Sequence, residues 1–189
     1  MLIYVHNLIV FSIVLKLTMG GVLSWFTTYF QNEKFVAVLG LDGAGKTALV
    51  HHLMFGEAIE PLPTIGFYIH NVLVNNMVMQ VVDVCGTGYD SGIWSHMYHS
   101  ADGIIYVVDS TDNERLQMSF TALDSVMRYP TMEGKPFLVL MNKQDGDARA
   151  SADDAKQMIE PGFWRVFDVS VKTGEGIDDA MVWFASNLS

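Results

Sequence analysis

From residue 33 onward, short apolar runs alternate with longer segments in which apolar residues recur at helical spacing. Continuous runs of valine, isoleucine and leucine are typical of strands that are covered on both faces of a parallel sheet. The pattern predicts strands at 35–39, 66–74, 77–84, 103–109, 136–141 and 164–170, and helices at 46–55, 113–129, 151–159 and 177–188. Alternation of this kind indicates an α/β fold with a six-stranded, mostly parallel sheet and helices on both faces.

The segment before residue 33 follows a different pattern. Residues 1–19 form a mostly apolar extension that is marginal in length for a membrane span, contains Lys16, and lacks the basic start of a signal peptide. Residues 20–32 place apolar side chains at roughly helical spacing, which predicts an amphipathic helix that either packs on the domain or lies on a membrane. If translation starts at Met19, Gly20 opens the M-G-x-x-x-S pattern for N-myristoylation. Residues 33–189 are then the folded domain.

Length and charge narrow the class of protein. A chain of 189 residues suits one domain with a single core. Its formal net charge of −10 argues against a nucleic-acid partner, because phosphate neutralisation needs clustered lysine and arginine. The single cysteine, Cys85, cannot form an intrachain disulfide, which fits a reducing cytosol.

A glycine-rich segment follows the first predicted strand. From Gly40 to Thr47 it reads G-L-D-G-A-G-K-T, which fits the phosphate-binding pattern G-x-x-x-x-G-K-[ST] between a strand and a helix. Backbone N–H groups of such a loop surround phosphates, the lysine reaches the β- and γ-phosphates, and the Thr47 hydroxyl binds Mg²⁺. A chance glycine-rich turn is the alternative, and the flanking strand and helix count against it. The candidate nucleotide-binding residues here are Asp42, Gly43, Ala44, Gly45, Lys46, Thr47 and Ala48.

Two further segments indicate that the nucleotide carries guanine. Asn142-Lys143-Gln144-Asp145 follows an apolar strand, and the Asp145 carboxylate can accept hydrogen bonds from the two adjacent donors that guanine offers and adenine lacks. By itself N-K-x-D could be a helix cap, but the phosphate loop makes that interpretation remote. The Asn142-Lys143-Gln144-Asp145 segment also disfavours an ATPase or a P-loop kinase, because its carboxylate matches guanine and not adenine. Ser170-Val171-Lys172 follows the last strand, and we expect the backbone N–H of Val171 or Lys172 to contact the guanine carbonyl.

Another candidate motif ends the hairpin predicted for 66–74 and 77–84, whose strands are joined by Asn75-Asn76. Asp83-Val84-Cys85-Gly86 fits D-x-x-G. Asp83 would hold Mg²⁺ through water, and the Gly86 N–H would meet the γ-phosphate. Without the other motifs an ordinary turn at the end of a strand would explain this segment equally well.

The sequences of these motifs resemble those of the ADP-ribosylation-factor and factor-like (Arf-like) family of small GTPases. The similar segments are G-L-D-x-x-G-K-T, N-K-Q-D and P-T-I-G-F at residues 63–67, and the resemblance runs from about residue 20 to residue 188. It implies that the Thr64 hydroxyl joins Mg²⁺ in the GTP state, and that Lys46 and Gly86 act on the phosphates during hydrolysis.

The resemblance also implies a way of working. We expect a monomeric switch that cycles between GDP and GTP and acts in membrane traffic or organisation. Its partners would be an exchange factor, a GTPase-activating protein and effectors that bind the switch regions. It would be cytoplasmic and attach reversibly to a membrane through its N-terminus.

The chain departs from the family at a catalytic position. Arf proteins carry W-D-V-G-G-Q where residues 82–87 read V-D-V-C-G-T, so Thr87 replaces the glutamine that orients the attacking water. Because positioning supplies most of phosphoryl-transfer catalysis, this change predicts weak hydrolysis. Two hypotheses follow: a slow switch that needs a GTPase-activating protein, and a GTP-bound scaffold that does not hydrolyse.

Overall fold

The computed structural model describes residues 33–59, 66–74, 77–84, 94, 97, 99–147, 149–159 and 162–188. The chain divides into two units, Met1–Glu33 and Lys34–Ser189, and the elements below belong to the second apart from Glu33 itself. The predicted extension at 1–19 and the amphipathic helix at 20–32 lie outside the described residues. In the part of the chain that is described, no helix is long and apolar enough to cross a membrane.

The sheet is six-stranded, as the apolar pattern predicts, and its strands run in the order β2-β3-β1-β4-β5-β6. Strand β4 pairs in parallel with β1 on one side and with β5 on the other, and β5 pairs in parallel with β6. Strands β2 and β3 pair antiparallel over their whole length, with Val74 opposite Met77, which confirms the predicted hairpin pairing. The strands are β1 (Glu33–Leu39), β2 (Phe67–Val74), β3 (Met77–Val84), β4 (Gly103–Asp109), β5 (Phe137–Asn142) and β6 (Trp164–Asp168).

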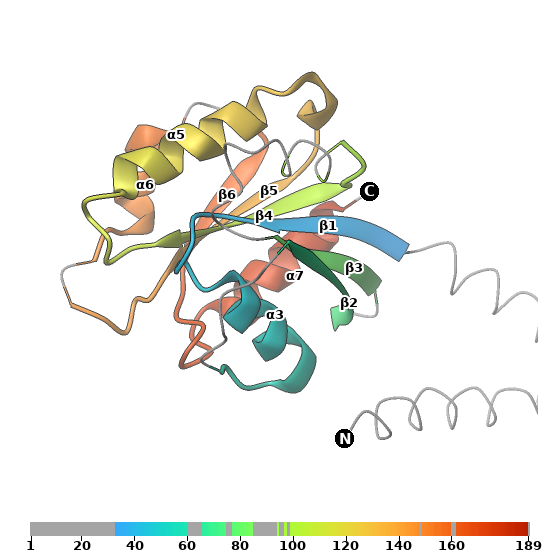
Figure 1. Ribbon diagram of the computed structural model, residues 1–189, viewed down its shortest axis with the longest axis horizontal. Helices are drawn as coiled ribbons and strands as arrows, with labels where there is room; N and C mark the ends of the chain where they lie inside the picture. Colours follow the sequence, from blue (N-terminus) through green and yellow to red (C-terminus); the bar gives the residue numbers. More distant parts are fainter. Residues whose placement is uncertain are drawn as a thin grey trace, which may run out of the picture. The chain divides into compact units, whose positions relative to one another are not determined.

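Helices cover both faces of this sheet (Figure 1). On one face lie α3 (Lys46–Phe55) and α7 (Ile177–Asn187), and on the other lie α5 (Leu116–Met127) and α6 (Ala152–Met158). Each face has its own apolar core, because successive side chains of a strand point to opposite sides. The buried β4 shows this alternation: Val107 packs with the α3 and α7 side, and Tyr106 packs with the α5 and α6 side.

The helix predicted at 113–129 is shorter in the structure, and its two ends have different causes. At the start, the backbone N–H of Arg115 donates to the Asp112 carboxylate at 3.1 Å, so residues 113–115 form turns before α5 begins at Leu116. At the end, the residue before a proline is disfavoured in helical conformation. Tyr129 precedes Pro130 and has an extended backbone, with φ −71° and ψ 130°, and α5 ends at Met127.

Helix α6 begins with a cap that its sequence supports. The Ser151 side chain accepts a hydrogen bond from the Asp154 N–H, and the Asp154 carboxylate accepts one from the Ser151 N–H at 2.8 Å. This reciprocal capping box satisfies donors that a helix start leaves unpaired.

The parallel strands bring one set of loops together. Because β1, β4, β5 and β6 run in the same direction, the segments that follow them lie along one edge of the sheet. Those segments are the glycine-rich loop after Leu39, the turn after Asp109, the N-K-Q-D segment at 142–145 and the loop after Asp168. The predicted site residues of these loops can therefore act together.

Candidate nucleotide-binding site

The glycine-rich loop between β1 and α3 adopts a backbone that only glycine accommodates well. Gly40, Gly43 and Gly45 have positive φ angles of 140°, 77° and 102°. A Cβ atom on Gly40 would collide with the backbone oxygen of Val107, and one on Gly45 would collide with the side-chain amide of Asn142. Close contact with β4 and β5 thus fixes the path of the loop, and α3 begins directly after it at Lys46. The N–H groups at a helix start favour an anion there.

Lys46 and Thr47, the first two residues of α3, are each held by a side-chain hydrogen bond. The Lys46 side chain is buried, and its Nζ donates to the Leu41 carbonyl at 2.8 Å, across the loop. The Thr47 hydroxyl donates to Oδ2 of Asp83 at 2.6 Å. Asp83 is fully buried near the end of β3. The structure thus brings the candidate Mg²⁺ ligands of the phosphate loop and of D-x-x-G into direct contact.

Asn142 links the phosphate loop to the loop after β6. Its buried side chain donates from Nδ2 to the Ala44 carbonyl at 2.8 Å, and its Oδ1 accepts from the Val171 N–H at 3.0 Å. Three predicted motifs are therefore joined through one amide. Because the Val171 N–H is engaged in this bond, Lys172 is the better of the two candidates for the guanine carbonyl contact.

The neighbours of Asp145 favour the ionised form of its carboxyl. Its Oδ1 accepts a hydrogen bond from the Ser170 hydroxyl at 2.7 Å, and its Oδ2 lies 3.6 Å from Nζ of Lys172. The Ser170 hydrogen bond is the main reason that the pKa of Asp145 lies below its ordinary value, and the charge of Lys172 lowers the pKa further. An ionised carboxylate only accepts hydrogen bonds, as contact with the two guanine donors requires.

Lys143 connects this segment to the end of β4. Within the described part of the chain it is the one non-glycine residue with a positive φ, at 67°. Its Nζ donates to Oδ2 of Asp109 at 2.5 Å. A backbone conformation of this kind costs energy and persists where the surroundings hold it, which is common at functional sites.

The last residue of β4 and the segment after it include residues that the sequence reasoning did not select. The Ser110 hydroxyl is buried and donates to the Asn142 carbonyl at 2.5 Å, and Asp109 holds Lys143. Arg115 forms an ion pair with Asp42 of the phosphate loop. Their position at or after the end of a buried parallel strand was the available signal, since ligands bind at that edge of such sheets.

Several predicted residues lie outside the described part of the chain. These are Thr64, Gly86, Thr87 and the candidate lipidation site Gly20. Their proposed roles in Mg²⁺ binding, hydrolysis and acylation stay predictions.

Comparison with known proteins identifies the family. The sequence profile of the ADP-ribosylation factor family matches residues 21–188. The chain belongs to the ADP-ribosylation factor family. It is 36% identical over 176 residues to ADP-ribosylation factor-like protein 1 of Drosophila melanogaster, covering 90% of this chain and 98% of the relative. The protein of the same name from Caenorhabditis elegans gives the same identity and coverage. ADP-ribosylation factor K of Dictyostelium discoideum is 35% identical, over 88% of this chain and 94% of the relative.

A solved structure supports the fold. The Arl6 BBS3 small GTPase from Trypanosoma brucei, which was determined with the nucleotide analogue GppNp, superposes with a TM-score of 0.71. The match covers 83% of this chain and 99% of that protein, at 23% sequence identity. Family membership makes this chain a small GTPase of the GTP-binding switch type. Members of the family generally hydrolyse GTP and interact with exchange factors, GTPase-activating proteins and effectors.

Proposed function

We propose that this protein cycles between GDP- and GTP-bound states, hydrolyses GTP slowly by itself, and acts in membrane traffic or organisation. The observation that carries the proposal is the Asn142 side chain, which bonds both the phosphate loop and the loop beside Asp145. A site that joins these loops can contact the phosphates and the base of one nucleotide at the same time.

Preference for guanine is assigned to Asp145. The Asp145 carboxylate, which is ionised at neutral pH, can accept hydrogen bonds from the adjacent N–H groups of guanine. Adenine would place an acceptor opposite the same carboxylate, and no hydrogen bond could form there. In nucleic-acid sites a paired contact of this type discriminates by roughly 1–3 kcal/mol.

The donor set at the phosphate loop fits Mg²⁺. The Thr47 hydroxyl and the buried Asp83 carboxylate, whose oxygens lie 2.6 Å apart, are the oxygen donors that this ion prefers. We assign Thr47 as a ligand, Asp83 as a ligand through water, and Thr64 as a third contributor in the GTP state. The ion, when bound, neutralises charge that develops on the phosphates.

Slow hydrolysis is inferred from Thr87, which stands at the position of the water-orienting glutamine. The threonine side chain is shorter than that of glutamine and is β-branched, so its hydroxyl reaches less far and positions water less well. We propose that a GTPase-activating protein compensates by supplying an arginine, an addition that accelerates related enzymes by about 10³–10⁵.

A comparison of the full-length wild type with Thr87→Gln tests this proposal. Both proteins are loaded with GTP and Mg²⁺, and phosphate release is followed in a single turnover. We expect measurable release by the wild type and release at least about tenfold faster by Thr87→Gln, because the amide restores water positioning. Equal rates in the two proteins would refute the role given to Thr87.

The same measurement decides a second candidate function, which Thr87 also favours. If the wild type keeps GTP intact while Thr87→Gln hydrolyses it, the protein is a GTP-bound scaffold and not a cycling switch. If neither protein binds GTP, both proposals fail.

We also propose that the protein is cytoplasmic and attaches reversibly to membranes through its N-terminus. The supporting pattern is Gly20 after Met19, followed by apolar residues at helical spacing. Mass spectrometry of the cellular protein should find a chain beginning at a myristoylated Gly20. A mature chain beginning at Met1 would exclude the acylated form.

A further inference from the structure

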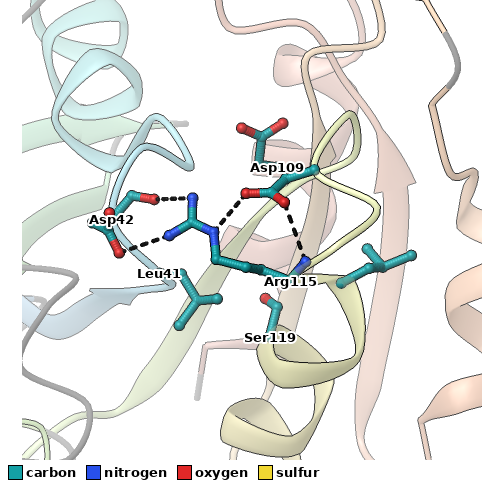
Figure 2. Close-up of a pocket in the computed structure, with 7 residues that line it drawn as sticks. Leu41, Asp42, Asp109, Arg115 and Ser119 are labelled. Atoms are coloured by element: carbon teal, nitrogen blue, oxygen red, sulfur yellow. Dashed lines mark hydrogen bonds and ion pairs between the residues drawn. The ribbon is translucent and has the colours of Figure 1, made fainter.

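Arg115 joins the start of α5 to the phosphate loop. Its Nη1 donates to Oδ1 of Asp42 at 3.0 Å, and its Nη2 donates to the backbone carbonyl of the same residue at 3.4 Å. Figure 2 shows the guanidinium turned toward Asp42, and both residues line a small pocket. Two nitrogens of one planar group thus hold the side chain and the main chain of one loop residue.

The other side of the guanidinium is fixed as well. Nε of Arg115 donates to Oδ2 of Asp112 at 2.6 Å, and the backbone N–H of Arg115 donates to Oδ1 of Asp112 at 3.1 Å. Hydrogen bonding to Arg115 lowers the pKa of Asp112, and the same bond raises the pKa of Arg115. Both groups are charged at neutral pH, and these hydrogen bonds within the protein fix the orientation of the guanidinium.

The charges around this pocket are unbalanced without Arg115. Asp42, Asp109 and Asp112 all line it, and Asp109 is already paired with Lys143. Arg115 is the ion-pair partner of the other two carboxylates. Asp42 stands within the loop that binds phosphate, so its carboxylate repels a bound nucleotide unless a cation compensates it.

Isolated ion pairs at a surface contribute little to stability, and side-chain exposures of 37% for Arg115 and 55% for Asp42 place this pair near that class. Its effect is therefore expected on the ligand. A fixed guanidinium changes the potential at the loop and restrains the loop's outer turn, and both act on how fast phosphate leaves.

We propose that Arg115 is a positioning residue for nucleotide binding, which neutralises Asp42, ties the phosphate loop to α5 and thereby slows nucleotide release. The inference rests on the guanine-nucleotide binding proposed above and adds a regulatory element to that site. In this proposal the Asp42 carboxylate weakens nucleotide binding by repelling the phosphates, and Arg115 of the same chain compensates that repulsion.

Dissociation of fluorescent GDP and GTP analogues from the full chain, in Mg²⁺ and excess unlabelled nucleotide, tests the proposal. Arg115→Gln should release nucleotide about three- to tenfold faster than the wild type, and GTP should be affected more than GDP because it carries more charge. The difference should shrink as ionic strength rises, since salt screens partly exposed charges. If Arg115→Gln sped up release only by disturbing the structure of the loop, the difference from the wild type would not depend on ionic strength in this way.

Arg128→Gln provides the matched control. Arg128 caps the same helix at its other end and donates from Nε to Asp124 at 2.7 Å, so the variant also removes an arginine–carboxylate pair of α5. It lies outside the proposed nucleotide site, and its release rates should equal those of the wild type.

Two further variants separate charge from geometry. Arg115→Lys keeps the charge but loses the planar fork, so its release rate should fall between those of the wild type and Arg115→Gln. Asp42→Asn removes the repulsive charge, so the double variant Asp42→Asn/Arg115→Gln should release nucleotide more slowly than Arg115→Gln alone. Thermal melting by circular dichroism confirms that each variant is folded.

The outcomes separate this inference from the proposed function. A wild type that binds neither analogue refutes the proposed function itself. A wild type that binds both, with Arg115→Gln releasing them at the rate of Arg128→Gln, refutes only the role of Arg115. A double variant as fast as Arg115→Gln refutes the compensation of Asp42.

Discussion

Single side chains in this site act by fixing other groups of the protein as much as by facing a ligand. Ser170 is an example, because its hydroxyl donates to Oδ1 of Asp145 and also accepts from the Thr173 N–H at 3.2 Å. The first bond lowers the pKa of the Asp145 carboxyl, and the second holds the loop that carries the candidate guanine contact. One hydroxyl therefore sets both a charge and a backbone position.

Removing the Ser170 hydroxyl should raise the pH at which the protein begins to unfold in acid. In the wild type the pKa of Asp145 is lower in the folded state than its ordinary value of 3.8. The ionised carboxylate therefore stabilises the folded state above pH 3.8, and this stabilisation is lost as the pH falls through the folded-state pKa. In Ser170→Ala we expect the pKa of Asp145 to move back toward 3.8, and Lys172 keeps part of the shift.

An NMR titration of the Asp145 carboxyl measures this change directly, and acid unfolding should begin at a higher pH in Ser170→Ala. Ser186→Ala is the control, because the Ser186 hydroxyl donates to the Trp183 carbonyl in α7 and does not contact Asp145. An unchanged pKa of Asp145 in Ser170→Ala would contradict the assigned cause.

At the scale of elements, the junction between β1 and the phosphate loop depends on close contact with β4. Gly40 has φ 140°, and a Cβ there would meet the backbone oxygen of Val107. Backbone atoms of a central parallel strand cannot move aside without breaking its pairing with β1 and β5.

Alanine at Gly40 should therefore be much more costly than alanine at a glycine that needs only a positive φ. Gly134→Ala is the matched control, because its φ is 74° and nothing lies within 4 Å of the added Cβ. We expect Gly134→Ala to lower the free energy of unfolding by about 1–2 kcal/mol. Urea unfolding should show Gly40→Ala losing at least about 2 kcal/mol more, with weaker nucleotide binding. Similar decreases in the free energy of unfolding in both variants would show that the β4 backbone moves to accommodate the added Cβ.

At the scale of the whole molecule, loops from separate parts of the chain form one candidate nucleotide site, and a ligand that binds only the folded state stabilises it. A ligand at a concentration about a thousandfold above its Kd adds roughly 4 kcal/mol to the free energy of unfolding. For a domain of this size that corresponds to a rise in Tm of roughly 8–16 °C.

We therefore expect GDP with Mg²⁺ to raise Tm by this amount, and ADP at the same concentration to leave Tm nearly unchanged. Scanning calorimetry of the full chain measures both. A shift with ADP as large as that with GDP would refute the guanine preference assigned to Asp145.

Much of the fold was predictable because the apolar runs mark buried strands plainly. The strands at 77–84 and 103–109 and the helix at 46–55 have the predicted bounds in the structure. The bounds of α5 were harder to predict, because the Asp112 side chain bonds the backbone before the helix and Pro130 changes the conformation of the residue before it.

The sequence by itself determined the class of nucleotide loop, the candidate guanine-reading residues and the family, because those depend on residue types at fixed spacing along short segments. Only the tertiary structure decided which of these residues touch. Asn142 meets Ala44 and Val171, and Arg115 meets Asp42, across long stretches of intervening chain. Such contacts follow from parallel strands that place distant loops at one edge of the sheet, and no local pattern encodes which loop will face which.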